Sequence, residues 1–217
     1  MLPNINDNIV RIGGYSLYRN DVISSHPKHG VCIYIRDNIR VGNVSRVLPN
    51  TLGVHLPNFN VNFIVVYRPG SNVPEQNKGL LDLIEHFCGS NETVFMGDFN
   101  LPSICWNNAG QTRFGSQTYR EFYARLTSLG LSQWVHEPTF LYSDNILDLV
   151  LTTDVDRVMN LHLLHPLPRC GYSPVVFNYL FQFLASRMVF LPAERPKALF
   201  SCGIGPILLL FADTWPL

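Results

Sequence analysis

The stretch VFMGDFNLPSICW, residues Val94 to Trp106, decides how the rest of the sequence is interpreted. An apolar run typical of a short buried strand ends at Gly97, and Asp98 and Asn100 follow it directly. Asp and Asn stabilise turns through their own backbone, so these residues alone favour a turn. Functional sites of α/β proteins nevertheless lie at strand ends, where an Asp can accept a proton or hold a metal and an Asn can donate to a phosphate oxygen. The stretch is therefore either a turn or a site.

The composition is that of one sizeable domain with a full core, since 47% of the 217 residues are hydrophobic. Sixteen basic and sixteen acidic residues cancel, so no global field recruits nucleic acid. The five cysteines form no C-x-x-C pair, which indicates neither a disulfide framework nor a zinc site and favours an intracellular location, nucleus or cytoplasm. The N-terminus has no signal-peptide pattern. The apolar stretch Ala198 to Ala212 is too short for a membrane helix, so no membrane partner is expected.

The hydrophobic pattern predicts an α/β layered domain with mixed sheets, because strands occur in runs with helices inserted between them. We expect strands at residues 31–36, 51–56, 61–68, 93–97, 146–153 and 173–180, and helices at residues 74–87 and 116–129. From residue 181 onward the sequence has no clean period. We therefore divide the chain into a domain, residues 1–180, and a divergent or disordered tail, residues 181–217.

Other polar residues stand at strand ends or inside apolar strands. Tyr67 and Arg68 end the strand before Pro69. Asp148 interrupts the apolar run NILDLVLTT. An ionised acid inside such a strand must be paired or hydrogen-bonded, which is typical of a residue that orients a catalytic partner. The alternative for Asp148 is an edge-strand acid that faces solvent.

Together these segments resemble the endonuclease domain of non-LTR (LINE-like) retrotransposons, within the endonuclease/exonuclease/phosphatase superfamily. The matching pieces, in order, are GGYSLYRND, HGVCIYIRD, VVYRPGSN, VFMGDFNLPSICW, LGLSQWVHEPTF, NILDLVLTTD and YSPVVF, and their order and spacing match from about residue 2 to residue 180. The resemblance implies a DNase I-like, four-layer α/β/β/α sandwich with two mixed β-sheets. It also implies Mg²⁺-dependent hydrolysis of DNA phosphodiesters, as in target-site nicking, and a reverse transcriptase domain in the parent polyprotein.

The resemblance also assigns roles to particular residues. It implies that Asp98 binds the metal and holds or activates the attacking water, and that Asn100 hydrogen-bonds the scissile phosphate or the water. It implies that Tyr67 contacts the phosphate and that Asp148 supports a catalytic histidine. Positioning and charge stabilisation of this kind supply most of the catalysis in phosphoryl transfer.

Two further residues are candidates for substrate contact. Arg68 stands beside Tyr67 at the end of its strand. Thr139, in the EPTF segment, is a candidate for a contact to phosphate or to backbone, and a capping or turn role fits it equally well.

The chain departs from the family pattern at two places. It begins at the segment that follows the family's metal-binding Glu, so the first strands and that Glu are expected to be missing. Gly171 and Tyr172 stand where the family has an Asp and the catalytic His. A tyrosine, with a pKa near 10, cannot supply an imidazolium. His162 and His165 are nearby, but their spacing is more typical of ordinary surface histidines.

The sequence therefore predicts a degenerate copy of a retrotransposon endonuclease domain with impaired activity. A non-catalytic remnant that binds nucleic acid or protein is the alternative. A phosphatase- or sphingomyelinase-like relative is a third alternative, which the segments LDLVLT and SQWVHEPTF disfavour.

Overall fold

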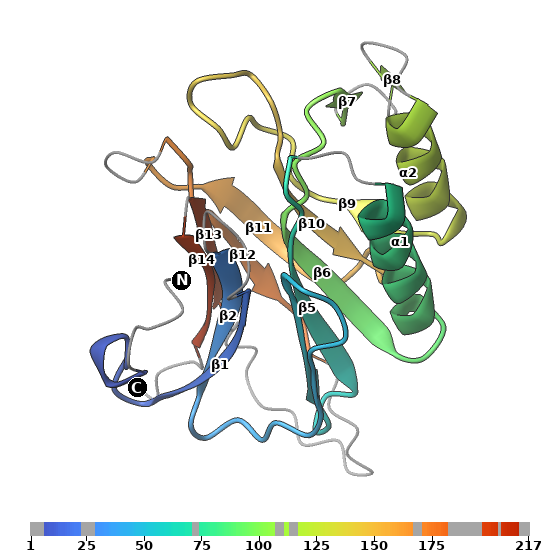
Figure 1. Ribbon diagram of the computed structural model, residues 1–217. Coiled ribbons are helices and arrows are strands. Elements are labelled where there is room, and N and C mark those ends of the chain that lie inside the picture. Colours follow the sequence, from blue (N-terminus) through green and yellow to red (C-terminus); the bar gives the residue numbers. More distant parts are fainter. Residues whose placement is uncertain are drawn as a thin grey trace.

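The computed structural model describes residues 7–22, 29–70, 74–106, 111–112, 117–166, 171–181, 197–203 and 205–212. Two six-stranded sheets pack face to face, and two α-helices lie side by side over the outer face of one of them (Figure 1). We call the sheet beneath the helices the helix-covered sheet and the other sheet the open sheet. A short 3-10 helix, η1 (Asp7–Ile9), precedes the first strand.

The helix-covered sheet has the strand order β3-β4-β5-β6-β10-β9. Its strands are β3 (Val44–Ser45), β4 (Thr51–Leu56), β5 (Val61–Tyr67), β6 (Glu92–Asp98), β10 (Asp148–Thr152) and β9 (Ser132–Gln133). β5 and β6 are parallel and the other neighbours are antiparallel. The helix α1 (Pro74–Cys88) connects the parallel pair, as a crossover between parallel strands requires, and α2 (Gln117–Ser128) lies beside it.

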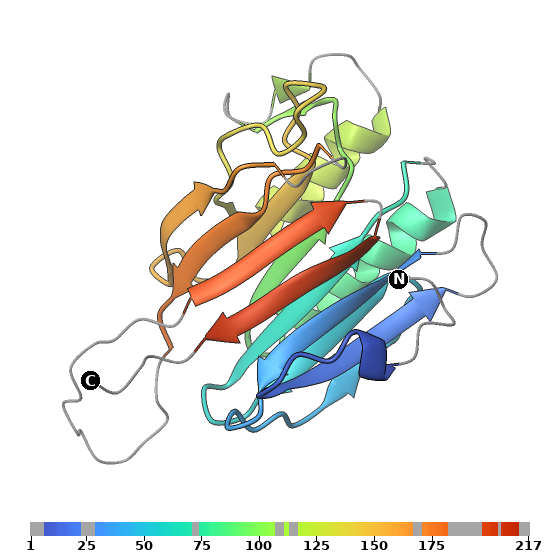
Figure 2. The same cartoon turned by 90° about the vertical axis from the view of Figure 1, so that its left-hand side faces the viewer.

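The open sheet has the order β1-β2-β14-β13-β12-β11 and is seen face-on in Figure 2. Its strands are β1 (Tyr15–Val22), β2 (His29–Arg36), β14 (Gly205–Ala212), β13 (Lys197–Gly203), β12 (Val175–Tyr179) and β11 (Val158–Leu163). β2 and β14 are parallel and the other neighbours are antiparallel. A small ladder joins β7 (Ile104–Cys105) to β8 (Gln111–Thr112).

The predicted α/β sandwich with two mixed sheets is confirmed. The helices begin and end within a residue of their predicted bounds, because Leu80, Leu83 and Ile84 of α1 and Phe122 and Leu126 of α2 form buried stripes at helical spacing. Among the described residues, both α-helices lie over the helix-covered sheet. The segment around Val10 and Ile12 packs on the outer face of the open sheet, against Cys32 and Tyr34. No helix in the described part of the chain is long and apolar enough to cross a membrane.

The core fills the space between the two sheets. Successive side chains of a strand point to opposite faces, and one of the two sets on each sheet points into the core. Phe63 of β5 and Tyr179 of β12 meet there, with ring centroids 5.3 Å apart. Burial raises the pKa of the Cys32 thiol to about 12, so this thiol stays protonated at neutral pH.

Two segments of the predicted tail are strands of the open sheet. β13 and β14 lie between β2 and β12, where they pair with both of these strands. Residues 182–196, 204 and 213–217 of that tail lie outside the described residues.

Candidate active site

Three of the predicted catalytic residues lie at the same end of the helix-covered sheet, where β5 and β6 end and β10 begins. In the parallel pair β5–β6, Tyr67 is the register partner of Asp98, and in the antiparallel pair β10–β6 Asp148 is the partner of the same Asp98. Register partners present their side chains on the same face of a sheet. Asp98 is 2% exposed and Asp148 is fully buried, whereas Tyr67 is half-buried. Segments distant in the sequence therefore bring these polar side chains together on neighbouring strands.

The turn after β6 depends on unusual backbone conformations at Gly97 and Asn100. Gly97 has φ +139°, and a Cβ placed on it would lie 1.8 Å from the carbonyl oxygen of Val66. Only glycine fits there. Asn100 has φ +47°, a left-handed conformation that Asn tolerates, and its N–H donates to Oδ1 of Asp98 at 2.9 Å. The stretch from Val94 to Trp106 thus contains a turn, and the turn itself positions Asp98 and Asn100.

Arg68 lies behind this turn. Its N–H donates to the carbonyl oxygen of Asp98 at 2.7 Å, and its guanidinium donates to Oδ1 of Asn77 and to the carbonyl oxygens of Phe99 and Asn100. The residue is 4% exposed, and desolvation by burial lowers its pKa. These contacts reach the protein's own backbone and α1, and the predicted substrate contact of Arg68 stays a prediction.

Thr139 is also used internally. It is fully buried, and its hydroxyl oxygen accepts the N–H groups of Leu147 and Asp148, both at 3.1 Å. This geometry is one of the contacts left open by the sequence, the one to backbone, and the phosphate contact stays a prediction. The hydroxyl holds the start of the strand that carries Asp148.

Replacing Thr139 by Val is expected to lower the free energy of unfolding by about 2 kcal/mol, because two buried N–H groups lose their acceptor while the shape is kept. Thr139→Ser, which keeps the hydroxyl, is the matched control and should cost less than half as much. Urea denaturation measures both. A Val variant of unchanged stability but reduced DNA affinity would instead support a substrate contact.

Gly171 and Tyr172 lie at the end of the loop that precedes β12. Gly171 has φ +71°, and a Cβ on it would lie 2.4 Å from the ring of Tyr142. Tyr172 forms a β-bridge with Phe140, and the two rings are 4.7 Å apart. Tyr172 is therefore held by aromatic packing. The two nearby histidines are exposed, and Nδ1 of His162 lies 2.9 Å from the carbonyl oxygen of Asn160.

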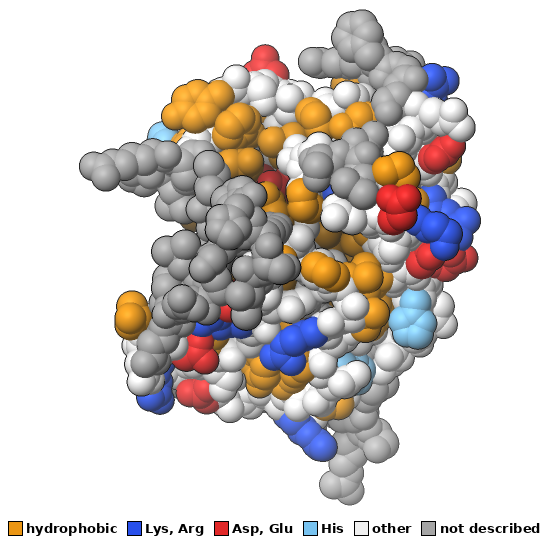
Figure 3. Space-filling view, in the orientation of Figure 1, with side chains coloured by type: hydrophobic (Ala, Val, Ile, Leu, Met, Phe, Trp, Pro, Cys, Tyr) orange, Lys and Arg blue, Asp and Glu red, His pale blue; other side chains and the backbone are white. Residues whose placement is uncertain are grey.

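An exposed apolar loop beside Tyr172 was not anticipated from the sequence. Leu141 is 65% exposed and Tyr142 is 72% exposed, and the loop is closed by a bridge between Phe140 and Asn145. Hydrophobic side chains gather at the upper end of the face shown in Figure 3. The short FLYSDN segment has no periodicity, so only the structure reveals that two large apolar side chains face solvent.

Comparison with known proteins relates the central part of the chain to a family. Residues 61–167 match the family described as endonuclease-reverse transcriptase. Over this range, just under half of its length, the chain is similar to that family. The matched range includes Tyr67, Asp98, Asn100 and Asp148.

Two solved structures share the fold. The endonuclease domain of TRAS1, a telomere-specific non-LTR retrotransposon, has a TM-score of 0.62 and 16% identity, over 79% of this chain and 82% of that one. The 3′ phosphatase NExo from Neisseria, bound to a product DNA hairpin, has a TM-score of 0.62 and 15% identity, over 83% and 84%. No curated protein matches the chain.

The site offers few oxygen ligands of its own to a divalent cation. Asp98 and Asp148 supply two carboxylates on neighbouring strands, and Asn100 follows two residues after Asp98. Mg²⁺ is usually held by one or two carboxylates together with substrate phosphate oxygens. Within the described ranges, no group of three His, Cys, Asp or Glu could hold a metal ion. A cation here would therefore need oxygens from the substrate.

Proposed function

We propose that this domain is a DNA phosphodiesterase of the retrotransposon-endonuclease type whose turnover is much reduced. The observation that supports this best is the alignment of Tyr67, Asp98 and Asp148 at one strand edge, next to a turn held by Asp98 and Asn100. An arrangement of buried acids beside amide and phenol donors is suited to binding a phosphodiester and a water molecule.

Each residue has a distinct role in this proposal. The Asp98 carboxylate accepts a hydrogen bond from the attacking water and orients it, and it also contributes to the cation site. The Asn100 amide and the Tyr67 hydroxyl donate to non-bridging phosphate oxygens. Mg²⁺, when bound by Asp98 and Asp148, would neutralise the charge of the phosphate.

The reduced turnover follows from Tyr172. A phenol carries no positive charge, so it cannot stabilise the phosphate charge as an imidazolium does. A single missing catalytic group typically costs 10²–10⁴-fold in rate.

Plasmid nicking with and without Mg²⁺ tests the proposal. We expect slow, Mg²⁺-dependent conversion of supercoiled to open-circle plasmid when protein is in excess over DNA. Efficient nicking with the protein at catalytic amounts would overturn the impairment. Absence of both nicking and DNA binding would overturn the nuclease-type function.

A second candidate function is DNA binding without hydrolysis. The exposed Leu141 and Tyr142 beside the site favour it, since apolar side chains of this kind pack against bases or insert between base steps. The net charge of zero limits the electrostatic part of such binding. Binding that is lost in Tyr142→Ala, with no nicking under any condition, would favour this candidate.

Changing Tyr172 to His is expected to raise the nicking rate by less than tenfold. The imidazole would be restored, but a third metal-binding carboxylate would still be missing from the described residues. Initial rates of open-circle formation at several Mg²⁺ concentrations measure this, with Tyr172→Phe as the control for loss of the hydroxyl. Recovery of a hundredfold or more by the single change would contradict the expectation.

A further inference from the structure

We propose that Arg68 is a positioning residue: its guanidinium holds the carbonyl groups of Phe99 and Asn100 and thereby fixes the turn that carries Asp98 and Asn100. Nη1 of Arg68 donates to the carbonyl oxygen of Asn100 at 2.9 Å and to that of Phe99 at 3.4 Å. These carbonyls belong to the left-handed turn after β6. The effect on turnover rests on the proposed function, whereas the effect on the turn does not.

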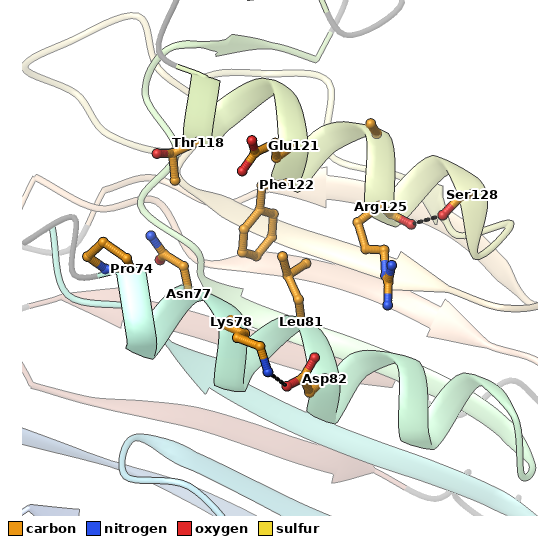
Figure 4. Close-up of a pocket in the computed structure, with 11 residues that line it drawn as sticks. Pro74, Asn77, Lys78, Leu81, Asp82, Thr118, Glu121, Phe122, Arg125 and Ser128 are labelled. Carbon is orange, nitrogen blue, oxygen red and sulfur yellow. Dashed lines mark hydrogen bonds and ion pairs between the residues drawn. The ribbon is translucent and has the colours of Figure 1, made fainter.

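The residue is anchored from the opposite side by the two helices. Nε of Arg68 donates to Oδ1 of Asn77 at 2.8 Å, and Asn77 itself is 5% exposed. Cζ of Arg68 lies 6.0 Å from the ring centroid of Tyr119 on α2, a cation–π distance. Figure 4 shows Asn77 on α1 beside the groove between the helices, with Thr118 on the facing helix. The guanidinium therefore links α1 and α2 to the turn.

This geometry requires arginine. A guanidinium has several N–H donors in one rigid plane, so it can donate to Asn77 through one nitrogen and to two backbone carbonyls through another. A lysine ammonium is a single donor centre on a flexible stem, and it cannot bridge the same acceptors. Desolvation by burial lowers the pKa of Arg68, and attraction to Tyr119 and to the Asp98 carboxylate opposes that lowering.

Native-state hydrogen exchange tests the effect on the turn without any need for hydrolysis. The N–H of Phe99 donates to the carbonyl oxygen of Leu147 at 2.9 Å, so its exchange reports on opening of the turn. In Arg68→Lys we expect the Phe99 amide to exchange at least tenfold faster, while the amide of Ile64 in the middle of β5 is unchanged. Asn77→Ala should show the same pattern. Asn77→Asp, which keeps an acceptor for Nε, should not.

The matched control is Arg125→Lys, at a surface arginine of α2 that is ion-paired with Glu85. It should leave the Phe99 amide unchanged. Unchanged Phe99 exchange in Arg68→Lys would overturn the proposal. If Arg68→Lys speeds exchange at all amides alike, the variant has lost global stability, and the comparison of Asn77→Ala with Asn77→Asp then tests the proposal. Equal Phe99 exchange in Asn77→Ala and Asn77→Asp would then overturn it.

The salt dependence of DNA binding separates a positioning residue from a phosphate contact. Each phosphate contact contributes about 0.9 to the slope of log K against log salt concentration. We expect Arg68→Gln to keep the wild-type slope of log K against log salt concentration. It should also lower the nicking rate by tenfold or more, or the DNA affinity by that factor if no nicking is seen. A slope reduced by about 0.9, with unchanged Phe99 exchange, would instead make Arg68 a phosphate ligand. If neither nicking nor DNA binding occurs, the proposed function fails while the exchange result still decides the role of Arg68.

Discussion

Replacing Asp98 by Asn should lower Mg²⁺-dependent nicking by at least about 10²-fold, because a positioned acid-base group is typically worth 10²–10⁴-fold. Asn has the same shape, and its Oδ1 can still accept the N–H of Asn100, so the turn is expected to remain. The loss would then come from the missing negative charge, which orients the water and holds the cation. Initial rates of open-circle formation over a range of Mg²⁺ concentrations measure it.

Asp82→Asn is the matched control, since Asp82 is an exposed acid of α1 paired with Lys78. It should nick at the wild-type rate. Equal nicking by Asp98→Asn and wild type would mean that the observed cleavage comes from a contaminant or from another site, and the proposed role of Asp98 would be wrong.

Replacing Gly97 by Ala should lower the free energy of unfolding by about 3 kcal/mol or more. Two costs add: the φ of +139°, which a residue with a Cβ rarely adopts, and a contact of 1.8 Å between the new Cβ and the carbonyl oxygen of Val66. That carbonyl belongs to the neighbouring parallel strand, so it can move away only if the β5–β6 pairing is disturbed. Urea denaturation, with the m-value checked for two-state behaviour, measures the change.

Substitutions at two other glycines measure the cost of the positive φ apart from the cost of the close contact. Gly130 has φ +70° and open space around its Cβ position, so Gly130→Ala should cost only about 1–2 kcal/mol for the backbone conformation. Gly13 has neither a positive φ nor a neighbour within 4 Å, and Gly13→Ala should be nearly neutral. A Gly97→Ala variant no less stable than Gly130→Ala would show that the end of β6 can shift to make room for a Cβ. The close contact with the carbonyl oxygen of Val66 would then carry no cost.

Much of the fold was predictable because its signals are local. The helical stripe of α1 and the apolar run of β6 depend on residues close in sequence, and both elements were predicted. β11 was missed because Asn160 and His162 alternate with its buried side, which weakens the apolar signal. β13 and β14 were missed because their segment has no clean period, and only pairing with distant strands makes them part of a sheet.

The sequence named the residues that the strands bring together, but it did not predict which neighbouring side chains point into the protein. The resemblance named Tyr67, Asp98 and Asp148, and the strand register aligns them. It did not reveal which side chains turn inward. Arg68 and Thr139 are polar residues next to a predicted site, and such residues are usually assumed to face a ligand. Their burial results from backbone acceptors and donors that only the folded chain supplies.

The strand order of the two sheets has a consequence for how the chain folds as it is synthesised. The helix-covered sheet is built from one continuous stretch, β3 to β10, whereas the open sheet joins β1 and β2 to strands that come after Val158. The ribosome delivers the N-terminal part first. Until the last strands of the open sheet emerge, β1 and β2 can pair only with each other, and the apolar inner face of this hairpin stays uncovered by the rest of its sheet. Pairings over such sequence separations form slowly, so we expect this hairpin to be the part of the nascent chain most exposed to aggregation.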